Sequence, residues 1–193
     1  MIRACSSRMP TRLAGRYASS VLEYTIEDLN PDEVHDVVFA HAAMQVTTYA
    51  TLADAGFAAK VSEGLASRVE SLLAAPVCKV AKSARGNVLG LGMVVDGPEW
   101  WEMPEADDFV WPAVTRYLST LFTMPGTHGS GLGKALLDAV LPGREAAYLW
   151  TEVGNERARR FYEREGFAAD GYTKRTTGWG DMLMMRMVRT QPA

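Results

Sequence analysis

The stretch Thr127-His128-Gly129-Ser130-Gly131-Leu132-Gly133-Lys134 decides the fold, because it joins a predicted strand at residues 117–123 to a predicted helix at residues 131–141. The helix carries an apolar stripe at helical spacing that includes Leu132, Leu136 and Val140. A glycine-rich approach to a helix directs several backbone N–H groups toward one point, where the helix dipole favours negative charge. The stretch therefore indicates either a phosphate-binding turn or a glycine-rich turn that binds nothing.

Two common phosphate motifs do not fit this stretch. A Walker A loop requires glycine five positions before Gly133 and Ser or Thr after Lys134, but His128 and Ala135 stand there. A dinucleotide fingerprint requires glycine three positions after Gly131, where Lys134 stands. A third pattern, Gln/Arg-x-x-Gly-x-Gly/Ala, fits both glycines, with His128 at its first position.

A second motif follows at residues 155–167, Asn-Glu-Arg-Ala-Arg-Arg-Phe-Tyr-Glu-Arg-Glu-Gly-Phe. Much of it is explained by helix stability alone, since Asn155 is a good N-cap and Gly166 a good helix end. Helix stability does not explain why Asn155 and Tyr162 both occur downstream of the glycine-rich turn.

Together the two motifs resemble the cofactor-binding half of the GNAT superfamily of N-acyltransferases over residues 117–167. In residues 21–116 the resemblance rests only on the order of the elements. It implies an α/β, single-domain GNAT-like fold over residues 21–190, in which a mixed central β-sheet with splayed parallel strands is flanked by helices. The predicted order is strand, two helices, three strands, helix, strand, helix and two strands.

The resemblance also implies a donor site for acetyl-CoA and no metal. The backbone of Leu121 and Thr123, with Phe122 between them, would pair with the pantetheine arm as an added strand. The N–H groups of Gly129, Ser130, Gly131, Leu132, Gly133 and Lys134 would hold the pyrophosphate. His128 replaces the usual Gln or Arg, and the Lys134 side chain either adds positive charge or is simply solvated.

Two residues of the second motif receive roles from the same resemblance. Asn155 would hydrogen-bond the pantetheine, and Tyr162 would lie near the thioester sulfur. A phenol with a pKa of about 10 can protonate a departing thiolate. Without that role, Tyr162 is an aromatic side chain packed in the core.

Direct acyl transfer also requires a proton acceptor, because an alkyl amine is mostly protonated near pH 7. The positions where the family commonly carries a glutamate are occupied by Tyr117 and Trp150. Glu152 is the first candidate, because it shares a strand face with Trp150. Asp107 and Asp108 are further candidates. Each of the three acids is otherwise a solvated surface charge, and a water chain to bulk solvent is the alternative acceptor.

The acceptor is expected to be a primary amine of a small molecule or peptide. Trp100, Trp101, Trp111 and Trp150 suggest an aromatic wall, and Glu105, Asp107 and Asp108 would favour a cationic amine. Each tryptophan taken singly is also explained by ordinary packing.

The remaining segments show ordinary start and stop signals. We predict a strand at 21–29, a helix starting at Asn30-Pro31, a second helix at 57–74 that Gly64 weakens, and a hairpin of strands 77–81 and 88–95. Residues 96–112 are predicted to be a loop. Strands are predicted at 147–153, 168–176 and 182–188, and a helix at 155–165.

Composition sets the broad class. The chain has 193 residues, of which 48% are hydrophobic, and a net charge of −3, which leaves no electrostatic footprint for nucleic acid. The sequence contains no run of 18 apolar residues, so no membrane-spanning helix is predicted. Two cysteines, Cys5 and Cys78, suit a reducing cytoplasm. Residues 1–20 are expected to be a disordered extension, and a homodimer is compatible with the resemblance.

Three functions therefore compete. The first is an acetyl-CoA-dependent N-acetyltransferase acting by direct transfer in a ternary complex. The second is a catalytically silent acyl-CoA-binding sensor or partner module, which the missing glutamates at positions 117 and 150 keep open. The third, a nucleotide-phosphate enzyme, is disfavoured by the two motifs that fail.

Overall fold

The computed structural model describes residues 22–103 and 110–190. The expectations for residues 1–20 and for Glu105, Asp107 and Asp108 lie outside these described residues. Within them, no helix is long and apolar enough to cross a membrane.

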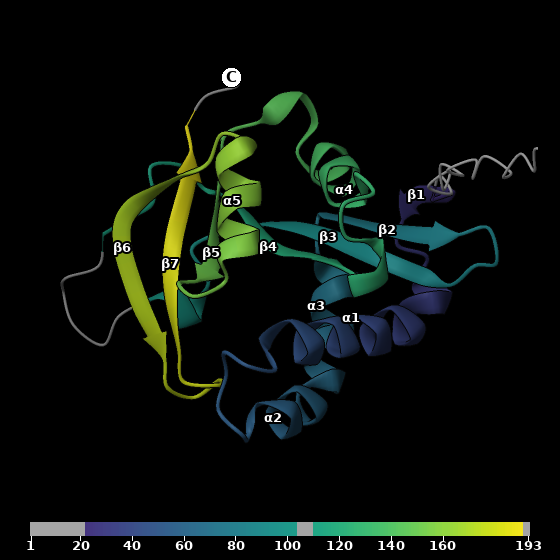
Figure 1. Cartoon of the computed structure of the whole chain (residues 1–193), viewed down its shortest axis with the longest axis horizontal. Helices are drawn as coiled ribbons and strands as arrows, with labels where there is room; N and C mark the ends of the chain where they lie inside the picture. Colours follow the sequence, from purple (N-terminus) through teal and green to yellow (C-terminus); the bar gives the residue numbers. More distant parts are fainter. Residues whose placement is uncertain (1–21, 104–109, 191–193) are drawn as a thin grey trace, which may run out of the picture.

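The described residues form a seven-stranded sheet in the order β1-β2-β3-β4-β5-β7-β6 (Figure 1). The strands are β1 (Tyr24–Asp28), β2 (Val77–Ser83), β3 (Val88–Asp96), β4 (Arg116–Thr123), β5 (Ala147–Glu152), β6 (Ala168–Thr176) and β7 (Met182–Arg189). Neighbouring strands pair antiparallel, except β4 and β5, which are parallel. The mixed α/β sheet predicted from the sequence is confirmed.

The parallel pair β4 and β5 separates almost at once. Its register contains one residue pair, Tyr117 with Tyr148, although β4 continues to Thr123 and β5 to Glu152. On its other edge, β4 stays paired with β3 up to Thr123. The register with β3 shifts where Met93 pairs with Thr120 and Val94 with Leu118, leaving Ser119 as an extra residue. Such a bulge bends its strand, which favours the departure of β4 from β5.

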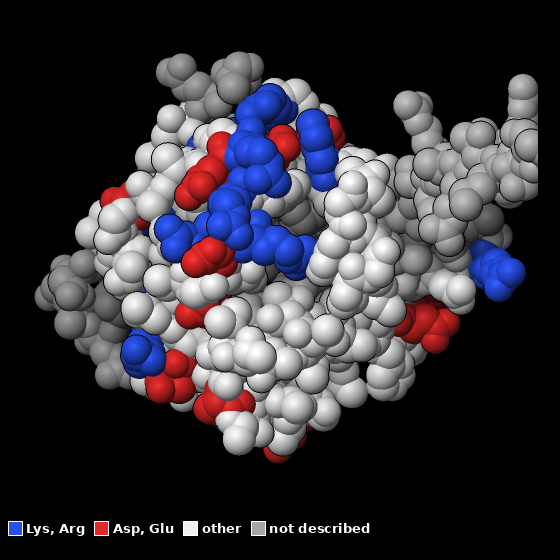
Figure 2. Space-filling model, in the orientation of Figure 1, with Lys and Arg blue, Asp and Glu red and all other residues white. Residues whose placement is uncertain are grey.

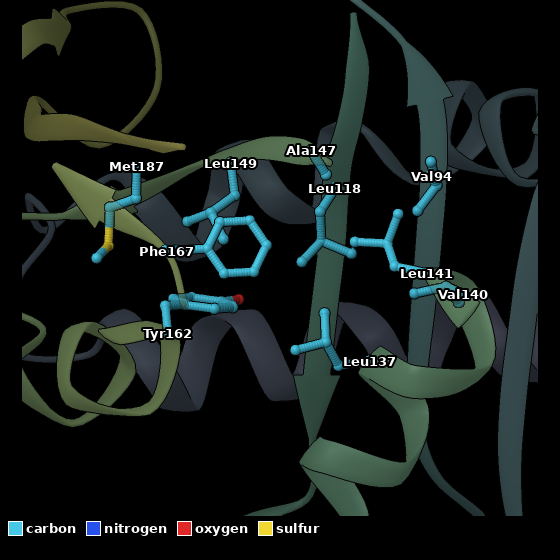
Figure 3. Packing of buried hydrophobic residues seen from close by; sticks show 10 residues of the cluster. All are labelled: Val94, Leu118, Leu137, Val140, Leu141, Ala147, Leu149, Tyr162, Phe167 and Met187. Carbon is cyan, nitrogen blue, oxygen red and sulfur yellow. The ribbon is translucent and has the colours of Figure 1, made fainter. Parts of the chain in front are cut away.

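Helices cover both faces of the sheet (Figure 1). One face carries α1 (Val34–Tyr49), α2 (Phe57–Glu63) and α3 (Leu65–Ala74), and the other carries α4 (Leu132–Val140) and α5 (Glu156–Arg164). Side chains of α4, α5 and the central strands share one buried cluster, seen in Figure 3, and α1 and α3 pack with β2 and β3 in another. The sheet is therefore buried on both sides, as the apolar runs in β3 and β5 require.

Several start and stop signals are confirmed. Asn30 caps a 3-10 turn at Pro31–Glu33 that leads into α1, its side chain accepting from the Asp32 N–H at 3.2 Å. The β2–β3 hairpin closes through a hydrogen bond from the Gly86 N–H to the Ser83 carbonyl. Gly166 follows the C-cap of α5 and has a left-handed backbone conformation, with φ of 87°.

Two predicted segments need correction. The single helix expected at 57–74 is two helices, α2 and α3, because Gly64 leaves the helical conformation with ψ of 4°. The loop expected at 96–112 contains a 3-10 turn at Trp100–Glu102, in which the Glu102 side chain accepts from the Glu99 N–H at 2.8 Å. The Glu99 side chain in turn accepts from the backbone N–H of Glu102. This reciprocal capping stabilises a turn inside a segment rich in loop-forming residues.

Candidate active site

A cavity of about 1560 Å³ passes through the sheet where β4 and β5 separate. Its lining includes Gln45 of α1 and Arg68 of α3 on one face, and Lys134 of α4 and Tyr162 of α5 on the other. A sheet with fully paired strands would block this passage, so the separation of β4 and β5 creates the site.

The glycine-rich turn forms one side of the cavity. Gly129 and Gly131 both have left-handed backbones, with φ of 83° and 90°, and a side chain at either position would meet open space. Ser130 stabilises the turn, since its hydroxyl donates to the Thr127 carbonyl at 2.7 Å and accepts from the Leu132 N–H at 3.3 Å. The first-turn amides of α4, including Gly133 and Lys134, have no acceptor within the helix. The turn therefore has the backbone geometry of an anion cradle.

Basic side chains surround this cradle. Figure 2 shows Lys and Arg gathered over α5 beside the hollow, and Arg157 and Arg164 of that helix line the cavity. His128 also lines it, and burial followed by the charge of Arg157 lowers the pKa of His128. A lowered pKa favours the neutral form of His128, which can still donate a hydrogen bond. Arg157, Arg164 and Lys134 supply permanent positive charge beside the turn, and Lys134 is already paired with Asp138 at 2.7 Å.

The free edge of β4 forms a second wall. Leu121, Phe122 and Thr123 all line the cavity beyond the point where β5 departs. The Phe122 ring lies 5.2 Å from the His41 ring and 6.1 Å from the Tyr49 ring, measured between centroids. Phe122 therefore points toward α1, while the backbone edge of its strand faces the space that β5 vacates.

Asn155 and Tyr162 both line the cavity from the side of α5. Asn155 is the helix cap, its side-chain oxygen accepting from the Ala158 N–H at 3.2 Å. Tyr162 is buried, and Figure 3 shows its ring against Phe167 with the hydroxyl oxygen on the side of Leu118 and Leu137. Burial raises the pKa of Tyr162, with a smaller contribution from Tyr49, so its phenol keeps its proton near neutral pH.

Glu152 lies at the end of β5 on the face shared by Trp150. It is 8% exposed, its Oε2 is buried without a hydrogen-bond partner, and it is not among the described residues that line the cavity. Burial and then the charge of Glu152 raise the pKa of Tyr49, which does line the cavity, to about 12. Glu152 is thus a buried carboxylate whose charge acts on a residue of the cavity.

Two carboxylates that sequence reasoning missed lie at the root of the separated strands. Glu102 is fully buried and accepts from the Tyr148 hydroxyl at 2.9 Å and from the Trp150 Nε1–H at 2.8 Å. Glu99 lines the cavity and accepts from the Trp101 Nε1–H at 3.1 Å, and burial raises the pKa of Glu99. The sequence signal that could have found them is the spacing of a capping box, with Glu102 three residues after Glu99.

The expected aromatic wall is partly assembled. Trp100, Trp101 and Trp150 line the cavity, with the rings of Trp101 and Trp150 5.6 Å apart, whereas Trp111 is not among the described lining residues. Tyr172 of β6 and Trp179 of the β6–β7 turn also line it and were not foreseen. The aromatic surface therefore comes from segments far apart in the sequence.

Comparisons with known proteins agree with this geometry. A family model described as the acetyltransferase (GNAT) family matches residues 56–167. An uncharacterized N-acetyltransferase from Mycobacterium tuberculosis and one from Mycobacterium bovis are each 39% identical over 59 residues, or 28% of this chain. The match spans only 38% of the length of these relatives.

Solved structures resemble the whole fold. A GCN5-related N-acetyltransferase from Rhodopseudomonas palustris has a TM-score of 0.62 and 15% identity, covering 92% of this chain and 100% of that one. PaiA N-acetyltransferase from Thermoplasma acidophilum, solved in complex with coenzyme A, has a TM-score of 0.61 and 13% identity, covering 88% and 100%. At these identities the likeness shows a shared fold.

The buried histidine beside the cavity makes stability depend on pH. Burial, and then the charge of Arg68, lowers the pKa of His41 to about 3, against 6.5 for the free group. The unfolded chain takes up this proton as the pH falls below about 6.5, and the folded chain does so only near 3. The free energy of unfolding should therefore fall between these limits, by about 2 kcal/mol from pH 7 to pH 5.

Urea unfolding of wild type and His41→Gln at pH 7 and pH 5 measures this contribution. We expect the variant to lose about 2 kcal/mol less than wild type over that interval. His35→Gln, at an exposed position of α1, is the matched control and should follow wild type. Equal pH dependence in wild type and His41→Gln would show that His41 does not carry the effect.

Proposed function

Because the chain belongs to the acetyltransferase (GNAT) family, we propose that it transfers the acetyl group of acetyl-CoA to a primary amine of a small molecule or peptide. The observation that carries this proposal is the separation of β4 and β5 beyond Tyr117 and Tyr148, which opens a cavity through the sheet. The cavity has room for two molecules to meet, since ligand pockets are typically about 300–1000 Å³.

The residues around the passage fit the donor. The backbone edge of Leu121, Phe122 and Thr123 suits an extended pantetheine arm, which would hydrogen-bond to β4 in place of a strand. The turn at Gly129 and Gly131 suits the pyrophosphate, because no side chain obstructs its amides. Asn155 contributes its side-chain amide N–H, since its oxygen already caps α5.

Tyr162 is the proposed general acid. In direct transfer, the amine nitrogen attacks the thioester carbonyl carbon, the carbon–sulfur bond breaks, and an amide and a thiol are formed. The Tyr162 hydroxyl supplies the proton that the leaving sulfur takes up. Burial raises the pKa of Tyr162, so its phenol carries a proton at neutral pH and has one to give.

Glu152 is the proposed acceptor of the amine proton, and Tyr49 is its link to the cavity. What supports this role is a buried carboxylate with an unpartnered oxygen, close enough for its charge to raise the pKa of Tyr49. Glu99 is the competing base, because it lines the cavity directly and burial raises its pKa toward neutrality.

Release of free thiol from acetyl-CoA tests the enzyme against the silent module. We expect coenzyme A and acetyl-CoA, but not ATP or NAD, to raise the melting temperature, because a ligand that binds only the folded state stabilises it. We then expect thiol release to depend on an added amine. Stabilisation by acetyl-CoA without thiol release across a broad amine panel would instead identify a sensor or partner module.

Tyr162→Phe tests the general acid. We expect kcat to fall by about 100-fold, because general acid catalysis typically contributes that much, while the affinity for coenzyme A is retained. Tyr24→Phe in β1, which is not among the described lining residues, is the matched control and should behave as wild type. A Tyr162→Phe variant with unchanged kcat would remove this residue from the mechanism.

The kcat values of Glu152→Gln and Glu99→Gln separate the two candidate bases. We expect Glu152→Gln to lose about 100-fold in kcat, because the proton acceptor is removed. Glu99→Gln should keep a kcat close to that of wild type. If instead Glu99→Gln loses kcat and Glu152→Gln keeps it, the base is Glu99.

A further inference from the structure

Three polar side chains, two of them buried and one half-buried, face the cavity from the helices opposite the glycine-rich turn. His41 and Gln45 of α1 are 5% and 7% exposed, and Arg68 of α3 is half-buried. Both ring nitrogens of His41, Oε1 of Gln45 and Nε of Arg68 are buried without a hydrogen-bond partner in the described part of the chain. All three residues line the cavity, and we call them the α1–α3 subsite.

The three side chains form one cluster. His41 and Gln45 are one helical turn apart and therefore share a face of α1. Arg68 approaches from α3, and its charge helps to hold the His41 ring neutral. Leu72 and Met93 line the cavity nearby, and the Phe122 ring lies 5.2 Å from the His41 ring. A few polar groups set in an apolar wall are typical of a site that orients one small molecule.

Arg68 decides which charge the subsite accepts. Buried polar atoms without partners are costly, and water could serve His41 and Gln45. The Arg68 guanidinium is partly withdrawn from water, with its Nε buried and unpartnered, and Arg68 forms no ion pair with any described carboxylate, so an anion in the cavity would stabilise it. Its planar donors match the two oxygens of a carboxylate.

The charges elsewhere in the cavity favour the same conclusion. The described acidic lining residues are Glu99 and Glu165, and each already has a partner, Trp101 Nε1 at 3.1 Å and Lys134 Nζ at 3.6 Å. The basic lining residues are Arg68, Lys134, Arg157, Arg164, Lys174 and Arg175. Lys134, Arg157 and Arg164 lie beside the glycine-rich turn, so Arg68, Lys174 and Arg175 remain for the rest of the cavity. Even there, basic side chains outnumber acidic ones in the described walls, which disfavours a polyamine, in contrast to the cationic acceptor suggested by Glu105, Asp107 and Asp108.

We propose that the α1–α3 subsite binds a carboxylate of the acyl acceptor, so that the acceptor is an amino acid or another amine that also carries a carboxylate. This inference rests on the proposed acetyl transfer. The Arg68 guanidinium pairs with the carboxylate, and His41 donates one ring N–H to it. The Gln45 Oε1 accepts from an N–H or O–H donor of the same molecule.

Thiol release with paired substrates tests the carboxylate requirement. The probes are glycine, alanine, glutamate and phenylalanine, each against its α-amide, with putrescine as a diamine. We expect kcat/KM to favour at least one acid over its amide by at least tenfold. Arg68→Met should lower kcat/KM for that acid by about 10- to 100-fold, the range for losing a charged hydrogen-bond partner, and leave the amide unchanged.

Two controls accompany this experiment. Arg85→Met, at an exposed position of the β2–β3 hairpin, removes an equal charge away from the cavity and should behave as wild type. Unchanged affinity of Arg68→Met for coenzyme A shows that the variant is folded. Equal turnover of acids and amides, preference for putrescine, or an Arg68→Met variant that keeps its preference for the acid would each overturn the proposal.

A binding measurement keeps the subsite testable if no amine releases thiol, an outcome that would count against the proposed function alone. Calorimetry of the coenzyme A complex with the N-acetyl derivatives of the same amino acids, and with their amides, reports on the subsite directly. We expect an N-acetyl acid to bind and to lose at least tenfold in affinity in Arg68→Met. Failure of every N-acetyl acid to bind, or equal binding by wild type and variant, would overturn the inference.

Discussion

The architecture depends on the loss of hydrogen bonding between two adjacent parallel strands. β4 and β5 share one registered pair, Tyr117 with Tyr148, whose rings stack at 4.8 Å, and then diverge. Backbone groups left unpaired inside a protein are costly unless water or a ligand satisfies them. The fold tolerates this cost because the outer edges of both strands remain paired, β4 with β3 and β5 with β7. The open edge is thereby held at a fixed position on a rigid sheet.

Glu102 fixes the point at which the strands begin to diverge. Its carboxylate holds Tyr148 and Trp150, which are successive side chains on one face of β5, and its own turn is closed by the Glu99 N–H. The Tyr117 ring stacks on Tyr148, so both strands are tied to the same buried group. Glu102 therefore accepts hydrogen bonds from three donors in the core. A fully hydrogen-bonded buried carboxylate makes its surroundings rigid, so Glu102 supports the site structurally.

Local sequence signals predicted the part of the fold that runs from the glycine-rich turn to α5. The glycine-rich turn, the Asn155 cap and the Tyr162 stripe lie within 36 residues of one another, and each expresses a helix end or helix face that short-range chemistry specifies. The break at Gly64 was visible only as a weakness, because helix propensity alone does not decide whether a glycine ends a helix. Glu102 could not be assigned from sequence, since its partners lie 46 and 48 residues away. The α1–α3 subsite likewise depends on how two helices pack, which no local pattern records.

A cavity that crosses a sheet also gives two molecules separate walls to bind. The glycine-rich turn leads into α4, whereas His41 and Gln45 belong to α1 and Arg68 to α3, so these two parts of the cavity lie on opposite faces of the sheet. In the proposed reaction, acetyl-CoA and the amine would therefore each contact a different face. The order in which they bind would then be set by their affinities rather than by one molecule blocking the other.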